Sequence, residues 1–326
     1  MIAVFRSVRT TVVLLALALV LPACSGESRN QDAPPASQAG PAKLAVEVGS
    51  YDLAAGRKSR FLVGLIASDN RFVSYGTVEL GFAFLGKDKP SSTGQTSITA
   101  TGRFLPVPGS PPAEGKAGPV ALSAAEDRGV YAADVTFDRP GYWGVLVNAN
   151  LQGQGPASAT ATFQVLAKNE IPAVGDQALR TSNLTLASKG TPKGAIDSRA
   201  RTEAKVPDPE LHQATIAEAV AARRPAVVVF STPVYCVSRF CGPITDLVTD
   251  LAPQYPKASF IHVEIWRDYD KREVNKGAAD WLLRGKELHE PWVFVIGPNG
   301  KITARFDNVA TKAEIEGALK GLSARS

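Results

Sequence analysis

The sequence is poor in the residues on which most cofactor and metal chemistry depends. It holds three cysteines, three histidines and one methionine in 326 residues. A glycine-rich phosphate loop, a zinc-type cysteine spacing and a defensible Ser-His-Asp arrangement are all missing. The sequence therefore gives no support to a nucleotide-binding protein or a serine hydrolase, and we expect no bound cofactor.

Clustered charge and long apolar runs are also scarce. The formal net charge is +5 and the basic residues are scattered, which argues against a nucleic-acid partner. Beyond the N-terminus no run of 18 apolar residues occurs, so we expect no internal transmembrane helix. The chain does have 44% hydrophobic residues, enough for real cores, and 28 glycines with 23 prolines, which favour loops and all-β structure. Its length predicts more than one domain.

Residues 1–24 are typical of an export signal. Arg6 and Arg9 precede an apolar stretch over residues 11–21, and the tetrapeptide Leu-Pro-Ala-Cys ends at Cys24. This pattern resembles a bacterial lipoprotein signal, which implies a signal peptide over 1–23 and a lipid on Cys24. The lipid would anchor the protein to the cell membrane or outer membrane, facing the extracytoplasmic side. In the alternative, an ordinary secretory signal, Cys24 is incidental. Both interpretations export the chain to a compartment where disulfides persist.

Three segments follow before the last domain. Residues 24–42 are rich in Ser, Pro, Ala and Gln, and we expect a disordered tether. Residues 43–168 hold short alternating or apolar runs split by Gly, Pro, Asn and Asp, which predicts an all-β antiparallel sandwich. Within it, residues 87–118 are expected to be a long loop because Pro and Gly are frequent there. Residues 169–208 have few apolar anchors and are expected to be a second linker.

One hairpin inside the β-rich segment is distinctive. The turn Pro140-Gly-Tyr-Trp leads into an apolar run, and another strand pattern precedes it at 130–137. This segment resembles the late hairpin of immunoglobulin-like (Ig-like) modules on bacterial envelope proteins. The resemblance implies that Trp143 and Tyr131 are core residues rather than ligand contacts.

From residue 209 to 326 the predicted order of elements is α-β-α-β-α-β-β-α. Thr215 and Glu218 form a capping box that opens a helix to about residue 223, and Thr311 with Glu314 form another that opens the last helix. Strands are expected at 226–230, 259–266, 292–296 and 301–306, with an Asn-Gly turn at 299–300 closing the final hairpin. A further helix is expected over 273–287.

Residues 226–251 place Cys236 and Cys241 at a strand-to-helix junction. Residues 226–230 form a continuous apolar run, typical of a strand buried on both faces, and positions 244, 247, 248 and 251 define one apolar helix face. Near the first turn of a helix, unpaired N–H groups and the helix dipole favour the anionic form of a thiol. We therefore predict that Cys236 is reactive.

This junction, with Pro243 inside the helix, resembles the thioredoxin fold, and the resemblance covers residues 209–323. It implies that Pro291 is a cis-proline at the start of a hairpin strand, lying against the cysteines. Glu290, His289 and Tyr235 are then expected near Cys236.

The sequence departs from the thioredoxin pattern in three places. The cysteines are spaced C-x4-C rather than C-x-x-C, Val229 stands where thioredoxins carry a buried acid, and Tyr235 stands where they carry tryptophan. An ionised Glu290 would raise the pKa of a nearby thiol and oppose its nucleophilicity.

Three hypotheses remain open for the cysteine pair. In the first, Cys236 and Cys241 are catalytic: Cys236 attacks a disulfide in an extracytoplasmic protein and Cys241 resolves the mixed disulfide. In the second, the pair is a structural disulfide in a non-catalytic binding module. In the third, Cys236, Cys241 and His289 bind Cu(I), similar to copper-delivery proteins of this fold. We favour the first, an envelope thiol-disulfide oxidoreductase whose partners carry thiols or disulfides. The two other histidines, His212 and His262, are expected to be surface or satisfied core residues.

Overall fold

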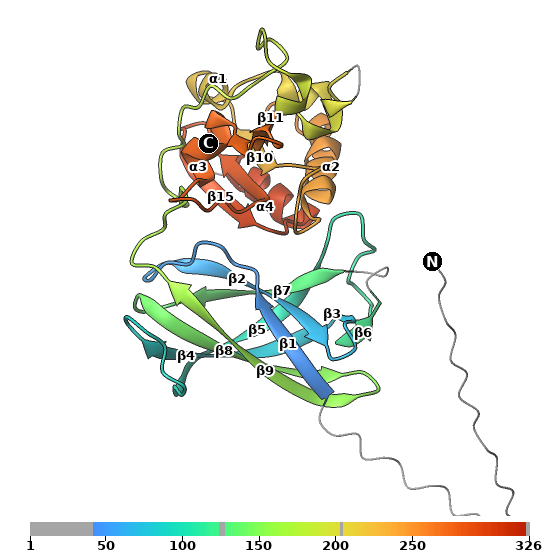
Figure 1. Cartoon of the computed structure of the whole chain (residues 1–326), viewed down its shortest axis with the longest axis vertical. Helices are drawn as coiled ribbons and strands as arrows, with labels where there is room; N and C mark the ends of the chain where they lie inside the picture. Colours follow the sequence, from blue (N-terminus) through green and yellow to red (C-terminus); the bar gives the residue numbers. More distant parts are fainter. Residues whose placement is uncertain (1–41, 124–127, 203–204, 324–326) are drawn as a thin grey trace, which may run out of the picture. The chain divides into compact units, whose positions relative to one another are not determined.

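The computed structural model describes residues 42–123, 128–202 and 205–323 (Figure 1). The predicted signal peptide, the lipidation site Cys24 and residues 25–41 of the predicted tether lie outside these ranges. The described chain is mostly antiparallel β-sheet with few helices, which confirms the β-rich character expected from the composition. No helix in the described ranges is long and apolar enough to cross a membrane.

The first nine strands form one sheet that closes on itself, which we call the β-ring. The order is β1-β9-β8-β4-β5-β7-β2, and β1 also pairs with β2, while β3 and β6 extend from β2. The bounds are β1 Ala42–Val48, β2 Lys58–Ala67, β3 Phe72–Ser74, β4 Thr77–Gly86, β5 Thr96–Pro106, β6 Val120–Leu122, β7 Gly129–Thr136, β8 Gly141–Leu151 and β9 Gly155–Val165.

Two strands close the β-ring by changing partners along their length. The first residues of β1 pair parallel with β9, and its later residues pair antiparallel with β2. Similarly, β5 pairs first with β4 and then with β7. Because β1 joins β9 to β2 and β5 joins β4 to β7, these four strands have no open edge where β1 and β5 pair with them.

Aromatic side chains fill the interior of the β-ring. Four phenylalanines lie with ring centroids 4.9 to 6.2 Å apart: Phe61, Phe82, Phe137 and Phe163. Trp143 and Tyr131 are buried beside them, as predicted. Each polar tip has a partner, since Tyr131 donates to the carbonyl of Tyr75 at 2.7 Å and Trp143 donates to that of Arg139 at 3.1 Å.

The prediction of one long loop over 87–118 is wrong, because β5 occupies residues 96–106. Its side chains alternate between exposed and buried in the second half of the strand. Most of the Pro and Gly residues that suggested a loop lie before residue 96 or after residue 105. Gly102 is needed where it stands, because a Cβ there would lie 2.9 Å from Cγ2 of Val78 and 3.3 Å from Cβ of Tyr131.

A four-stranded sheet lies in the C-terminal half. It consists of β10 (Ala226–Ser231), β11 (Ser259–Glu264), β14 (Trp292–Ile296) and β15 (Ile302–Asp307), in the order β11-β10-β14-β15. The first pair is parallel and the other two are antiparallel. All six residues of β10 are buried, as expected for a strand covered on both faces.

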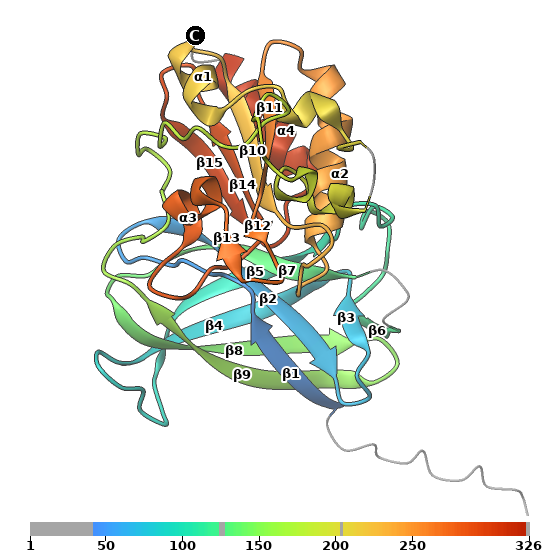
Figure 2. The same cartoon turned by 45° about the horizontal axis from the view of Figure 1, so that its top comes forward.

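Helices cover both faces of this sheet (Figure 2). They are α1 (Ile216–Ala221), α2 (Cys241–Leu251), α3 (Lys276–Leu282) and α4 (Lys312–Ser323). Phe230 packs in an apolar cluster with residues of α1 and α3, whereas its neighbour Val229 packs in another with residues of α2 and α4. Alternate residues of a strand point to opposite faces, so β10 holds both layers together.

Local signals predicted several element ends correctly. Thr215 accepts a hydrogen bond from the Glu218 amide at 3.1 Å, and the Glu218 carboxylate accepts one from the Thr215 amide at 2.7 Å. The capping box at Thr311 has the same reciprocal bonds. Gly300 closes the β14–β15 hairpin with a φ of +76°.

The prediction of a helix over 273–287 is wrong at both ends. The strand β13 (Glu273–Val274) pairs with β12 (Trp266–Asp268), and α3 begins only at Lys276. Asn275 holds the junction in an extended conformation by donating to the carbonyls of Ala195 and Glu264. At the other end, the chain turns at Gly285, which has a φ of +58°.

Residues 169–208, expected to be a linker, pack closely on their neighbours. They carry two 3-10 helices, η1 (Lys193–Ala195) and η2 (Ser198–Arg201), and a third, η3 (Pro209–His212), follows. Ser198 is buried and its amide donates to the Glu264 carboxylate at 2.7 Å. Ile171 and Ala178 of this segment also join an apolar cluster. Isolated apolar contacts and hydrogen bonds of this kind leave no hydrophobic period in the sequence.

The β-ring and the C-terminal half belong to one compact unit over residues 39–326. A buried ion pair joins them, because Nη1 of Arg305 in β15 lies 2.6 Å from Oδ2 of Asp52. The Asp52 carboxylate also accepts hydrogen bonds from the amides of Glu170 and Ile171.

Candidate functional site

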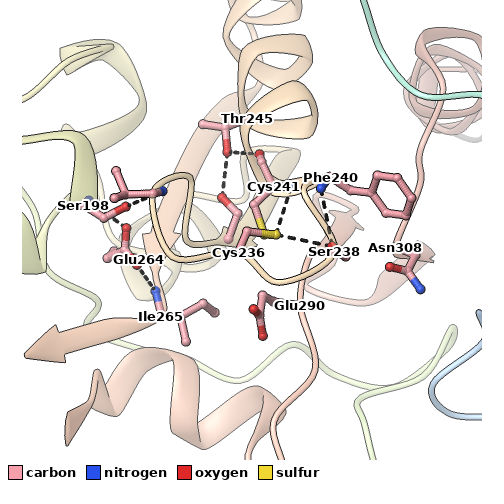
Figure 3. Close-up of a disulfide and its surroundings, with 12 residues drawn as sticks. Ser198, Cys236, Ser238, Phe240, Cys241, Thr245, Glu264, Ile265, Glu290 and Asn308 are labelled. Atoms are coloured by element: carbon pink, nitrogen blue, oxygen red, sulfur yellow. Dashed lines mark hydrogen bonds between the residues drawn. A yellow bond between two sulfur atoms is a disulfide. The ribbon is translucent and has the colours of Figure 1, made fainter. Parts of the chain in front are cut away.

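Cys236 and Cys241 form a disulfide at the start of α2, with their Cα atoms 5.9 Å apart (Figure 3). The two cysteines differ in exposure. Cys241 is the first residue of the helix and is fully buried, whereas Cys236 lies in the preceding loop and is partly exposed. A reactant can therefore reach the Cys236 sulfur more readily than the Cys241 sulfur.

The Cys236 sulfur lies among hydrogen-bond donors. The backbone amide of Cys241 donates to Cys236 Sγ at 3.3 Å, and the Ser238 hydroxyl lies 3.3 Å from the same sulfur. The Cys241 amide belongs to the first turn of α2, where amides have no partner within the helix. If the disulfide is reduced with this geometry kept, both donors stabilise a thiolate on Cys236.

Glu290 is the charged residue that the structure brings to the sulfurs. Its carboxylate and the sulfurs of Cys236 and Cys241 all lie within 4.8 Å of one another. The peptide bond between Glu290 and Pro291 is cis, as the resemblance to thioredoxins implies, and Pro291 directly precedes β14. Burial raises the pKa of Glu290 to about 7, and the negative charge of Glu264 adds to this effect. Near neutral pH both protonation states of Glu290 are therefore populated.

His289, the predicted third ligand of a copper site, does not belong to this group. Its ring stacks on Tyr51 with centroids 4.7 Å apart, and its side chain is 53% exposed. Among the described residues, the metal-capable group that contains the cysteines includes Glu290 and not His289. Neighbouring side chains of an extended segment point in different directions, which agrees with Glu290 facing the disulfide and His289 stacking on Tyr51.

Tyr235 precedes Cys236 and belongs to a neighbouring aromatic surface. Its ring stacks on Tyr269 with centroids 3.9 Å apart, and its hydroxyl accepts a hydrogen bond from Arg201 at 2.9 Å. These residues, together with Trp266, line a cavity of about 430 Å³. Because Tyr235 directly precedes Cys236, the cavity adjoins the cysteine loop. Its walls carry aromatic and charged side chains.

Hydroxyl groups that were not predicted from the sequence form hydrogen bonds around the buried Cys241. Thr245 donates to the carbonyl of Cys241 at 2.8 Å and shares a 2.7 Å hydrogen bond with the hydroxyl of Ser231. The contact of Ser238 with the Cys236 sulfur was not predicted either, although Ser238 lies only two residues after Cys236. Thr245 falls one helical turn after Cys241, a spacing that could have indicated a contact along the helix.

Comparison of the chain with protein-family models, with curated proteins and with solved structures found no match. Its function is therefore inferred from the geometry of the disulfide and its surroundings.

Proposed function

We propose that the protein is a thioredoxin-like thiol-disulfide oxidoreductase that acts on extracytoplasmic proteins through Cys236 and Cys241. The observation that carries the proposal is the unequal exposure of the two sulfurs at the start of α2. An accessible first sulfur and a buried second one suit sequential attack and resolution, because only the first has to meet another protein.

The arrangement of elements supports the thioredoxin-like interpretation. The sheet order β11-β10-β14-β15, with helices on both faces, agrees with the element order that motivated the resemblance. The cysteine pair follows β10 and begins α2, and the cis-proline opens β14. For the β-ring we propose an Ig-like module. In it β1 pairs with both β9 and β2, and β5 pairs with both β4 and β7.

The reaction begins with the reduced protein. The Cys236 thiolate attacks a substrate disulfide, forms a mixed disulfide and releases one substrate thiolate. Cys241 then loses its proton, attacks Cys236 Sγ and breaks the mixed disulfide, which releases the second substrate thiolate and restores the Cys236–Cys241 bond. Two electrons pass from the protein dithiol to the substrate, and an external thiol reductant must supply them again for another turnover.

Glu290 fits the role of proton acceptor for Cys241. Val229 is apolar, so the acid expected in thioredoxins at that position is missing, and Glu290 offers a carboxylate beside the sulfurs instead. A pKa of about 7 suits a group that takes a proton and returns it near neutral pH. In its protonated form Glu290 is neutral and does not oppose a thiolate on Cys236, and in its ionised form it can take the proton of Cys241.

The proposed location follows from the N-terminal sequence. We propose that Cys24 carries a lipid and that the protein faces the extracytoplasmic side of a membrane. An oxidising compartment also suits a chain whose two remaining cysteines are paired.

The reduction potential of the cysteine pair tests the proposed function. The protein is equilibrated against glutathione or dithiothreitol buffers, and the reduced fraction is measured by thiol alkylation. We expect a potential between about −120 and −270 mV, the span of dithiol catalysts. A value below about −300 mV would instead support the second hypothesis, a structural disulfide in a binding module, which the full burial of Cys241 favours.

A further inference from the structure

A second group of potential ligands lies away from the cysteines. Asp197 caps η2, His212 ends η3 and His262 lies in β11, and all three side chains are fully buried. We call them the His–Asp cluster. Oδ2 of Asp197 lies 3.3 Å from Nδ1 of His262 and 3.5 Å from Nε2 of His212. All three ligand atoms lie within 4.8 Å of one another.

Hydrogen bonds of ordinary length do not account for the buried imidazoles. Four buried side-chain atoms in the described ranges have no hydrogen-bond partner, and three of them are His212 Nδ1, His212 Nε2 and His262 Nδ1. Buried polar atoms are nearly always paired, because leaving one unpaired costs about 1–3 kcal/mol. The contacts to Asp197 are also longer than the roughly 2.7–2.9 Å of a charge-assisted hydrogen bond.

The same spacing fits ligands around a metal ion. Zinc bonds of about 2.0–2.1 Å in tetrahedral geometry place neighbouring ligand atoms about 3.3–3.4 Å apart. The two contacts to Asp197 are 3.3 and 3.5 Å. In addition, Nε2 of His262 lies 3.2 Å from the carbonyl of Ser231, the kind of partner that orients metal-binding histidines. When Nε2 of a neutral His262 donates to that carbonyl, the lone pair lies on Nδ1, which faces Asp197.

The surrounding charge favours a dication. Arg199 contacts the carboxylates of Asp197 at 2.7 Å, Asp208 at 2.6 Å and Asp246 at 3.6 Å. With neutral histidines, Asp197 and Asp208 carry one negative charge more than Arg199 balances, and the exposed Asp246 adds another that solvent screens. A divalent cation balances them, and Arg199 fixes the orientation of the Asp197 carboxylate.

We propose that Asp197, His212 and His262 form a zinc site that is independent of the cysteine pair. Two imidazoles and a carboxylate are donors that Zn²⁺ accepts, and the three of them leave one tetrahedral position for a water molecule. Because the ligands come from η2, η3 and β11, the ion fastens the segment before α1 to the sheet. All three ligands are fully buried, so a substrate cannot reach the open position and the role of the ion is structural.

Metal content of the purified chain tests the proposal. The protein is incubated with Zn²⁺, freed of excess ion by gel filtration and analysed by mass spectrometry for zinc. We expect about one zinc per chain in the wild type, in His289→Ala and in the double variant Cys236→Ser/Cys241→Ser, and a loss of at least tenfold in His212→Gln. Co²⁺ in place of Zn²⁺ should give visible absorption without a thiolate charge-transfer band.

A measurement on the wild type alone covers the case in which His212→Gln does not fold. Removing the metal with a chelator should lower the Tm by more than about 3 °C, and adding Zn²⁺ should restore it. The proposal is overturned if the wild type retains no zinc and its Tm ignores the chelator. It is equally overturned if His212→Gln keeps the metal or the double cysteine variant loses it. Because that double variant has no thiol exchange, the zinc site and the redox function fail or succeed separately.

Discussion

Replacing Glu290 with glutamine should stabilise the oxidised protein above pH 7 and leave its stability unchanged near pH 4. Burial raises the pKa of Glu290 from its ordinary value of 4.5 to about 7 in the folded protein. The folded state therefore favours the protonated acid. Below pH 4.5 the acid is protonated in both states and folding carries no ionisation cost. Between pH 4.5 and about 7 the unfolded chain ionises first, so the wild type loses stability as the pH rises.

The size of the loss follows from the two pKa values. A change from 4.5 to about 7 corresponds to roughly 3 kcal/mol, an upper value because the carboxyl retains some contact with solvent. The negative charge of Glu264 raises the pKa of Glu290 further and so adds to the cost of ionising it in the folded state. The Tyr51 hydroxyl donates to the backbone carbonyl of Glu290 and not to its carboxylate, so it does not offset this cost. Glutamine keeps the size and polarity of the side chain and removes its ionisation.

Urea denaturation at pH 4, 6 and 8 under oxidising conditions measures the effect. The free energy of unfolding of Glu290→Gln should exceed that of the wild type by about 2–3 kcal/mol at pH 8, by less at pH 6, and by nothing measurable at pH 4. Glu287→Gln is the matched control, because that side chain is 84% exposed, and it should differ from the wild type by less than about 0.5 kcal/mol throughout. A gain that is the same at every pH, or a variant less stable than the wild type at pH 8, would refute the reasoning.

Two further predictions concern the ion pair between the two halves and the donors around the sulfur. Arg305→Met should lower the free energy of unfolding by about 3 kcal/mol in urea denaturation, because it leaves Asp52 buried without its cation. Lys58→Met, which breaks a pair exposed on both sides, should cost less than about 0.5 kcal/mol, and equal losses would contradict the argument. Ser238→Ala should raise the thiol pKa of Cys236 in the reduced protein by roughly one unit, because a hydrogen bond to the sulfur is lost. The pH profile of alkylation measures this shift, and an unchanged profile would mean that Ser238 does not bond the thiolate.

Local chemistry in the sequence predicted much of the C-terminal half. The capping boxes at Thr215 and Thr311 and the turn at Gly300 each depend on residues a few positions apart, and each is present in the structure. Element ends without such a signal were predicted less well. The start of α3 depends on Asn275, whose partners Ala195 and Glu264 lie 80 and 11 residues away along the chain.

The candidate redox site was predicted in part, for a similar reason. The pairing of Cys236 with Cys241 follows from their being the last two cysteines of the chain. The cis peptide bond before Pro291 follows from the resemblance to thioredoxins. The choice between His289 and Glu290 does not, because both adjoin the cis-proline and a sequence does not state which side chain turns toward the disulfide. Packing decides it, with the His289 ring stacked on Tyr51 of the β-ring half.

By itself, the sequence determined those features in which the interacting residues are near neighbours: β-strands from alternation, helix starts from caps, and a thiol pair at a helix start. The tertiary structure alone decided the closure of the β-ring through β1 and β5 and the formation of the His–Asp cluster. Asp197 lies in a segment without hydrophobic period, and each of the two histidines looks ordinary in its own segment. Their meeting depends on contacts across 15 to 65 residues, and no local preference of the chain records which distant groups a folded core brings together.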